Sequence, residues 1–269
     1  MFEEPYRWIE AVENRRAYLD DQFKQGSPVV ALVYNAGILL LTFSSGTQKI
    51  YEIYDRIALG GMGHPADLER MRASLLEMAH LEGFNRSPSD VTIARLMKFG
   101  LAPPVKQAFE EIFRAPVVIK LLLVQLDPSF HRTPIMSLDY DGIFEEYTDM
   151  AVLAANPVIG QRMTDYLKKT KNLSSLPRDA AIQLALKAWA VGFSSQNKFA
   201  EEREQEEKKG KASLPSSSER DVIIKKALQT LKPEIAVLEE GHPGSSKFRT
   251  LGPKEMESIL TQWVHPSKE

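Results

Sequence analysis

The chain has 269 residues, of which 43% are hydrophobic and 26% are charged, with a formal net charge of -2 at pH 7 and no cysteine. This composition is that of a globular protein. It argues against general nucleic-acid binding, which needs an excess of clustered Lys and Arg to neutralise phosphates. The lack of cysteine excludes disulfides, thiolate nucleophiles and Cys-type zinc sites.

Nothing in the sequence predicts a membrane segment or a secretion signal. The longest apolar runs, VVALVYNAGILLL and VVIKLLLVQL, are interrupted and shorter than the roughly 20 residues that a membrane span needs. The opening stretch MFEEPYRW is acidic and has no apolar core, unlike a signal peptide. We therefore expect a cytoplasmic protein.

The first part of the chain predicts a helix followed by two β-hairpins. Apolar residues recur at helical spacing from residue 6 to 25, and Gly26 favours a helix end there. Two β-rich runs between residues 28 and 43 flank YNAG, which predicts a hairpin in which Asn35 and Gly37 can take positive φ. The stretch KIYEIYDRIALG predicts two further short strands.

The middle of the chain predicts two helical regions and three strands. One helix follows HPAD, and a second helical region runs from Asp90 to about Phe113. Pro103 and Pro104 must kink or split it, because neither can donate to the helical ladder. APVVIKLLLVQLD predicts a strand buried on both faces, and PIMSLDYDGIFEEY predicts a hairpin that turns at residues 141–142.

The last part of the chain begins with a strand, DMAVLAANP, that runs into a helix capped by Asn156. A longer helix follows, with an apolar face that includes Trp189. Residues 197–218 are highly charged and poor in apolar residues, so we expect a solvated or disordered excursion, with a docking tail as the alternative. PEIAVLEEGHPGSSKFRTL then predicts a hairpin, and GPKEMESILTQWV predicts a closing helix.

This order of elements resembles that of proteasome subunits, particularly the bacterial α-type. Four stretches carry the resemblance: GSPVVALVYNAGILLL, QKIYEIYDRIALGGMG, DVTIARLM and PEIAVLEE. The resemblance runs roughly from Tyr6 to Val264. It implies an α+β fold, a four-layer αββα sandwich of two antiparallel sheets between helix layers, as in Ntn hydrolases. We expect a single domain over residues 1–269, in which residues 1–26 form a gate segment and helix and residues 197–218 a charged insertion.

Ser27 raises the question of whether the chain is itself a peptidase. An N-terminal nucleophile hydrolase activates the hydroxyl of its first residue with its own α-amine, whose pKa lies near 8. Here that amine would appear only after cleavage of the peptide bond between Gly26 and Ser27. Active β-type subunits do carry a Gly before their Thr. Pro28 has no N–H to offer, Phe43 stands where active members have an acid, and the helix at residues 6–25 resembles the retained helix of α-type subunits. These features favour a noncatalytic chain.

Lys49 is the residue to which the resemblance assigns a function. In active β-type members this lysine sits beside the nucleophile, and in α-type members it lies in the pocket that receives the C-terminal tail of an activator. Gly63 falls where the family has a pocket glycine. One exposed lysine–carboxylate pair contributes only about 0–1 kcal/mol, but several linked pockets can raise avidity by roughly 10²–10⁴. The plainer interpretation of Lys49 is an exposed strand lysine.

The sequence thus predicts a noncatalytic α-type subunit of a bacterial proteasome. By resemblance, it forms a homo-oligomeric ring, expected to be a heptamer, that caps β-type rings and binds an ATPase ring activator. No cofactor or metal is expected, since the histidines share no metal-ligand spacing. Two alternatives stay open: a self-processing peptidase that uses Ser27 and Lys49, and a ring-forming scaffold without a peptidase partner. By the same resemblance, the gate is assigned to four N-terminal residues, Glu4, Pro5, Tyr6 and Trp8. For Tyr6 and Trp8 the alternative is a packed helix start.

Overall fold

The computed structural model describes residues 5–127, 133–202 and 214–264. Its elements are, in chain order, α1 (Pro5–Phe23), β1 (Val29–Tyr34), β2 (Gly37–Ser44), β3 (Ile50–Tyr54), β4 (Ile57–Gly63), α2 (Pro65–Asn85), η1 (Pro88–Asp90), α3 (Ile93–Arg95), η2 (Leu96–Leu101), α4 (Ala102–Glu110), β5 (Ile119–Gln125), β6 (Ile135–Leu138), β7 (Phe144–Tyr147), β8 (Met150–Leu153), α5 (Pro157–Leu167), η3 (Leu173–Ser175), α6 (Arg178–Glu202), α7 (Ser217–Thr230), β9 (Lys232–Glu239), β10 (Phe248–Thr250) and α8 (Pro253–Val264).

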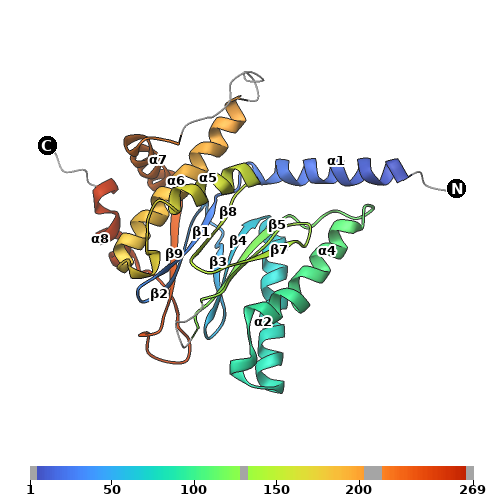
Figure 1. Cartoon of the computed structure of the whole chain (residues 1–269), viewed down its shortest axis with the longest axis horizontal. Coiled ribbons are helices and arrows are strands. Elements are labelled where there is room, and N and C mark those ends of the chain that lie inside the picture. Colours follow the sequence, from blue (N-terminus) through green and yellow to red (C-terminus); the bar gives the residue numbers. More distant parts are fainter. Residues whose placement is uncertain (1–4, 128–132, 203–213, 265–269) are drawn as a thin grey trace.

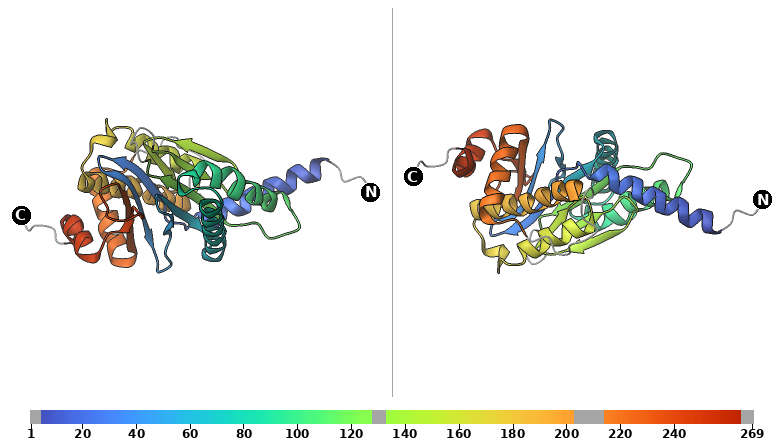
Figure 2. Two further views of the ribbon diagram at one scale, coloured as in Figure 1. Left: turned by 90° about the horizontal axis from the view of Figure 1, so that it is seen from below. Right: turned by 90° about the horizontal axis from the view of Figure 1, so that it is seen from above.

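The strands form two five-stranded sheets, which we call sheet A (β10-β9-β2-β1-β8) and sheet B (β3-β4-β5-β6-β7). Neighbouring strands are antiparallel throughout. Helices α5 and α6 pack on sheet A, and α2 packs on sheet B, so the sheets lie between helix layers (Figure 1). The predicted α+β sandwich is confirmed. Figure 2 shows that α1 extends away from these layers toward the N-terminus.

Two apolar clusters hold the layers together. The larger one lies between the sheets and under the helices of sheet A, and it draws on residues from Leu19 to Trp263. The second lies between sheet B and the helices α2 to α4. Strands β1 and β2 are buried at every position, because both of their faces are covered.

The hairpin predicted at YNAG is present, but the role predicted for its glycine is wrong. Neither Asn35 nor Gly37 has a positive φ. Gly37 instead pairs with Glu239 of β9 in sheet A. A Cβ at this position would lie 1.8 Å from the carbonyl oxygen of Leu238. Close approach of two strands therefore explains this glycine.

Pro103 and Pro104, which were predicted to kink or split the second helical region, change its hydrogen-bonding pattern but do not split it, since residues 93–110 are helical throughout. The chain forms a short α3, a π-helical turn η2 and then α4, with Pro103 and Pro104 in the first turn of α4. A π-helical turn is a local change of the hydrogen-bond ladder that accompanies such irregularities inside a helix. The helix ends at Glu110, a few residues earlier than predicted.

Helix α7 was not predicted from the sequence. The first part of the charged segment continues α6 to Glu202, residues 203–213 lie outside the described structure, and α7 begins at Ser217. A capping box starts α7, in which Ser216 accepts from the backbone of Glu219 and the Glu219 carboxylate accepts in return. The sequence SSSE carried this signal, but it was hidden in a run that resembled a linker.

Candidate functional site

Arg15 fixes helix α1 to the rest of the protein. Its guanidinium donates hydrogen bonds to the carbonyl oxygens of Ala108 (2.7 Å), Arg114 (3.0 Å) and Ile112 (3.3 Å), and only 8% of the residue is exposed. These carbonyls lie at and just beyond the end of α4, where the last helical carbonyls lack intrahelical partners and a cation is favourable. Nothing in the sequence pattern pointed to this contact, because it joins residues more than 90 positions apart.

The predicted apolar face of α1 is buried only in its second half. Leu19 is 0% exposed, whereas Trp8, one of the predicted gate residues, is 50% exposed. Of the other gate residues, Pro5 and Tyr6 begin α1 and their side chains are not described, and Glu4 lies outside the described residues. The first turns of α1 thus extend beyond the packed part of the helix (Figure 1).

Both hydrogen-bonding functions of the Ser27 hydroxyl are occupied. Trp189 Nε1 donates to Ser27 Oγ over 2.9 Å. Thr42 Oγ1 lies 3.5 Å from the same oxygen. Because Thr42 gives its own proton to the carbonyl oxygen of Pro28 over 2.7 Å, Ser27 must be the donor in that contact. The side chain is a buried link between α6 and the start of β1.

The peptide bond before Ser27 is also held in place. Gln196 Nε2 donates to the carbonyl oxygen of Gly26 over 2.8 Å, and the Gly26 N–H donates to the carbonyl oxygen of Phe23 over 2.9 Å. A Cβ at Gly26 would lie 2.4 Å from Met62 Cε, so the segment is tightly packed. The bond that self-processing would have to cut therefore lies inside the packed connection between α1 and β1.

Phe43, which by the resemblance stands where active members have an acid, belongs to a buried aromatic stack. It is 0% exposed, and its ring centroid lies 4.1 Å from that of Trp189, which in turn stacks at 4.7 Å on Phe193. An aromatic stack of this kind contributes packing energy. It offers no group that could take a proton or orient a lysine.

Lys49 lies at the entry to β3 and is half-buried. Its ammonium donates to the carbonyl oxygen of Phe43 over 3.4 Å, and within the described residues it forms no ion pair. The carboxylate of Glu234 instead accepts the backbone N–H groups of Lys49 (2.8 Å) and Ile50 (3.1 Å), which ties β9 to β3. Burial lowers the pKa of Lys49, and the charge of Glu234 acts in the opposite direction. No hydrogen bond in the described structure joins Lys49 to Ser27.

Gly63 lies at the same end of the β3–β4 hairpin as Lys49. The N–H of Gly61 donates to the carbonyl oxygen of Lys49 over 2.9 Å, and Gly63 is two positions farther along β4. Gly63 has a φ of +135°, and a Cβ there would lie 2.0 Å from the carbonyl oxygen of Val118. Its own backbone conformation and the nearby β5 segment therefore demand glycine, whether or not a ligand approaches.

Sequence reasoning missed the residues that hold Ser27. Trp189 appeared only as part of an apolar helix face, and its indole N–H gives no sequence signal. Thr42 and Gln196 were not singled out. It also missed a groove of about 740 Å³ between β6, β7, β8 and α5, which Lys49 and Gly63 do not line. This groove depends on where the two sheets end, which only the folded chain reveals.

The part of the chain that the structure describes contains neither a cluster of metal-ligating side chains nor a helix that could span a membrane. No three His, Asp or Glu side chains gather as ligands of a metal ion would. None of the helices in residues 5–127, 133–202 and 214–264 has the length and apolar character needed to cross a bilayer.

Comparison with known proteins agrees with the resemblance found in the sequence. No family model matches the chain. It is 26% identical over 186 residues to the proteasome subunit alpha of Actinosynnema mirum, which covers 68% of each chain. It is 30% identical over 160 residues to that of Xylanimonas cellulosilytica, 57% of this chain and 64% of the relative. It is 29% identical over 173 residues to that of Sanguibacter keddieii, 62% of this chain and 66% of the relative. The chain thus spans about two thirds of the length of these relatives, and over that length it is similar to bacterial proteasome α subunits.

Proposed function

We propose that this protein is a noncatalytic α-type subunit of a proteasome core particle. The observation that carries the proposal is the state of Ser27. Its hydroxyl is buried and hydrogen-bonded to Trp189 and Thr42, and the residue follows a helix anchored by Arg15. A nucleophile of the N-terminal type needs a free amine and an accessible hydroxyl. The names of the relatives support the α-type assignment.

We assign the docking of an ATPase ring activator to Lys49, with Gly63 beside it. The geometry supports this in two ways. The ammonium of Lys49 is partly desolvated, and its hydrogen-bond partner within the described residues is a carbonyl oxygen. An incoming carboxylate would stabilise the charged form of this lysine, which burial disfavours. Gly63 presents backbone without a side chain at the same hairpin end.

We further assign to residues 1–8 the gating of substrate entry. The exposed Trp8 and the unpacked first turns of α1 support this, because a segment that blocks an axial opening must not be held by its own subunit. The partners of the protein are then further copies of itself in a ring, expected to have seven members, together with a β-type subunit and the activator.

Co-expression with a β-type subunit tests the proposal. We expect both chains to elute together in one large particle whose peptide hydrolysis is lost when the β-type nucleophile is replaced by Ala. Hydrolysis by this chain alone, with an intact mass that lacks residues 1–26, would instead establish the Ser27 peptidase. A ring that never binds the β-type subunit would instead support the alternative of a ring-forming scaffold without a peptidase partner.

A further inference from the structure

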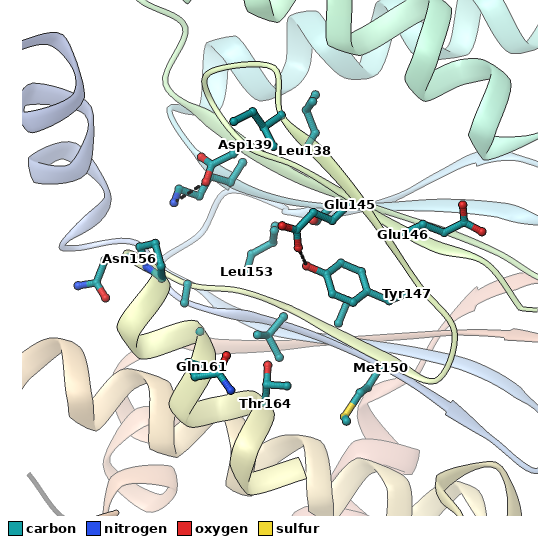
Figure 3. Close-up of a pocket in the computed structure, with 18 of the residues that line it drawn as sticks. Leu138, Asp139, Glu145, Glu146, Tyr147, Met150, Leu153, Asn156, Gln161 and Thr164 are labelled. Atoms are coloured by element: carbon teal, nitrogen blue, oxygen red, sulfur yellow. Dashed lines mark hydrogen bonds and ion pairs between the residues drawn. The ribbon is translucent and has the colours of Figure 1, made fainter. Parts of the chain in front are cut away.

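The two edges of the sandwich are built differently. At one edge, a groove of about 740 Å³ lies between the β6–β7 hairpin of sheet B and β8 with α5 (Figure 3). At the opposite edge, β3 of sheet B lies against β9 of sheet A, and a side chain of β9 is hydrogen-bonded to the backbone of β3. Lys49, to which docking is assigned, lies at this second, closed edge.

Glu234 is the side chain that closes this edge at the start of β3. Its Oε2 atom accepts the N–H of Lys49 over 2.8 Å and the N–H of Ile50 over 3.1 Å. Its own backbone is fixed in sheet A, where it stands opposite Thr42 of β2. Hydrogen bonds to an ionised acceptor are stronger than those between neutral groups. Glu234 therefore holds the backbone from which the side chain of Lys49 starts.

The backbone of Lys49 is held from both sides. Its N–H is bound by Glu234, and its carbonyl oxygen accepts the N–H of Gly61 on β4 over 2.9 Å. Its ammonium reaches the carbonyl oxygen of Phe43, in the strand that pairs with β9. A side chain that starts from a fixed backbone is preorganised, and it loses less conformational freedom when a ligand binds.

Glu234 holds Lys49 without neutralising it. Within the described residues the two side chains form no ion pair, because the carboxylate is directed at the backbone N–H groups. Burial lowers the pKa of Lys49, and the charge of Glu234 acts in the opposite direction. The ammonium thus stays available to a second carboxylate, such as the C-terminus of an incoming tail.

We propose that Glu234 is a positioning residue for docking, which fixes the ammonium of Lys49 where a terminal carboxylate can bind it. This rests on the docking role in the proposed function and adds a second residue to that site. The role belongs to the hydrogen-bonding oxygen of Glu234 rather than to its charge, since the negative charge itself repels a tail carboxylate.

Two substitutions separate the oxygen from the charge. Glu234→Gln keeps an oxygen that can accept both N–H groups, whereas Glu234→Ala leaves them without this acceptor. The probe is a fluorescein-labelled peptide with the C-terminal sequence of the ATPase chain and a free carboxylate, added to the assembled particle. Glu234→Gln should bind it at least as tightly as the wild type does. Glu234→Ala should bind it about tenfold more weakly or worse. The amidated peptide should bind weakly to all three.

Glu52→Ala is the matched control. Glu52 lies on the same strand and accepts the hydroxyl of Ser246 over 2.6 Å, which ties β3 to the loop between β9 and β10. No hydrogen bond joins it to Lys49 in the described structure. This variant should keep the affinity of the wild type. Equal losses in Glu52→Ala and Glu234→Ala, or an equal loss in Glu234→Gln, would overturn the positioning role.

Trace acetylation of Lys49, quantified by mass spectrometry over a range of pH, gives a readout that needs no tail. The alkaline plateau of the rate reports how freely the neutral amine reacts, so it should be unchanged in Glu234→Gln and higher in Glu234→Ala. The midpoint reports the pKa of Lys49. It should fall in both variants, because Glu234 is the charged group that acts on this ammonium among the described residues. A wild-type plateau in Glu234→Ala would overturn the inference.

Failure of positioning and failure of docking give different results. If Lys49→Ala abolishes binding of the peptide while Glu234→Ala binds it like the wild type, positioning is overturned and docking stands. If Lys49→Ala changes neither peptide binding nor ATPase stimulation, the docking role is overturned. The acetylation plateaus still show in that case whether Glu234 holds Lys49.

Discussion

Trp189 and Ser27 lie 162 positions apart in the chain and are joined by a hydrogen bond of 2.9 Å from the indole N–H to the hydroxyl oxygen. Trp189 is 0% exposed, so its N–H has no access to water and depends on this acceptor. The bond fastens the middle of α6 to the residue that precedes β1. In a peptidase this hydroxyl would have to be free to attack a substrate. Here it is buried and hydrogen-bonded to residues of α6 and β2.

Ser27→Ala should lower the free energy of unfolding by about 1–3 kcal/mol, because it leaves the buried indole N–H without an acceptor. Urea unfolding followed by tryptophan fluorescence measures this change. Peptide hydrolysis by the assembled particle should stay at the wild-type rate. A particle that loses activity on this substitution would contradict the noncatalytic assignment.

The matched control for this variant is Trp189→Phe, which removes the donor and keeps an aromatic ring against Phe43. Adding Ser27→Ala to that variant should cost much less than adding it to the wild type, since no N–H is then left unpaired. Equal costs in both backgrounds would show that the hydrogen bond contributes nothing to stability.

Local signals in the sequence were enough to predict most of the secondary structure, with helix α7 as the main exception. YNAG, the turn at residues 141–142 and the cap at Asn156 each act within a few positions, and each is found where it was predicted. The bonds of Arg15 and Trp189 span about 90 to 160 positions and depend on how the layers pack, so no local pattern could reveal them. The same is true of the groove, which exists only where two sheet edges meet.

Arg15→Ala should destabilise the protein by about 1.5–3 kcal/mol, since it removes charged hydrogen bonds to three carbonyl groups. Arg15→Lys should recover only part of this loss, because one ammonium cannot reproduce the planar fork of a guanidinium. Both values come from urea unfolding curves.

Arg16→Ala is the control on the same helix. Its side chain is 51% exposed and pairs with Asp141, so its loss should cost about 0–1 kcal/mol. If both alanine variants are equally stable, Arg15 does not anchor α1.

Gly63→Ala should lower the free energy of unfolding by at least about 1–3 kcal/mol. The added Cβ would meet the carbonyl oxygen of Val118 at 2.0 Å, and a φ of +135° is strained for any residue with a side chain. Gly241→Ala, where a Cβ meets nothing within 4 Å, should stay within about 0.5 kcal/mol of the wild type. Similar thermal midpoints for the two variants would refute this explanation of Gly63.

Deletion of residues 1–8 should speed the hydrolysis of an unfolded protein by the assembled particle, because this segment is assigned to the gate. Fluorogenic tripeptides, which are small enough to pass a partly closed opening, should be hydrolysed with a smaller change. The helix should remain anchored, since Arg15 and Leu19 lie beyond the deletion. An unaltered rate with the unfolded protein would argue against the gate.

Lys49→Ala should leave the assembly intact and abolish the stimulation of degradation by an ATPase ring. The side chain makes one long hydrogen bond to Phe43, so its loss should change stability little. Lys254→Ala, on the exposed surface of α8, is the control and should keep full stimulation. Stimulation that survives Lys49→Ala would remove the docking role.

The same docking should depend on pH in a defined direction. Burial lowers the pKa of Lys49, so its ammonium loses the proton at a lower pH than a free lysine would. Between that lowered pKa and the ordinary one, the unfolded chain binds more protons than the folded chain, and stability therefore rises with pH. The affinity for a tail carboxylate must fall over the same window, because it needs the charged form. Binding of a synthetic activator tail peptide, measured by fluorescence anisotropy from neutral to alkaline pH, should weaken in the wild type and be weak at every pH in Lys49→Ala, and a flat profile in the wild type would contradict it.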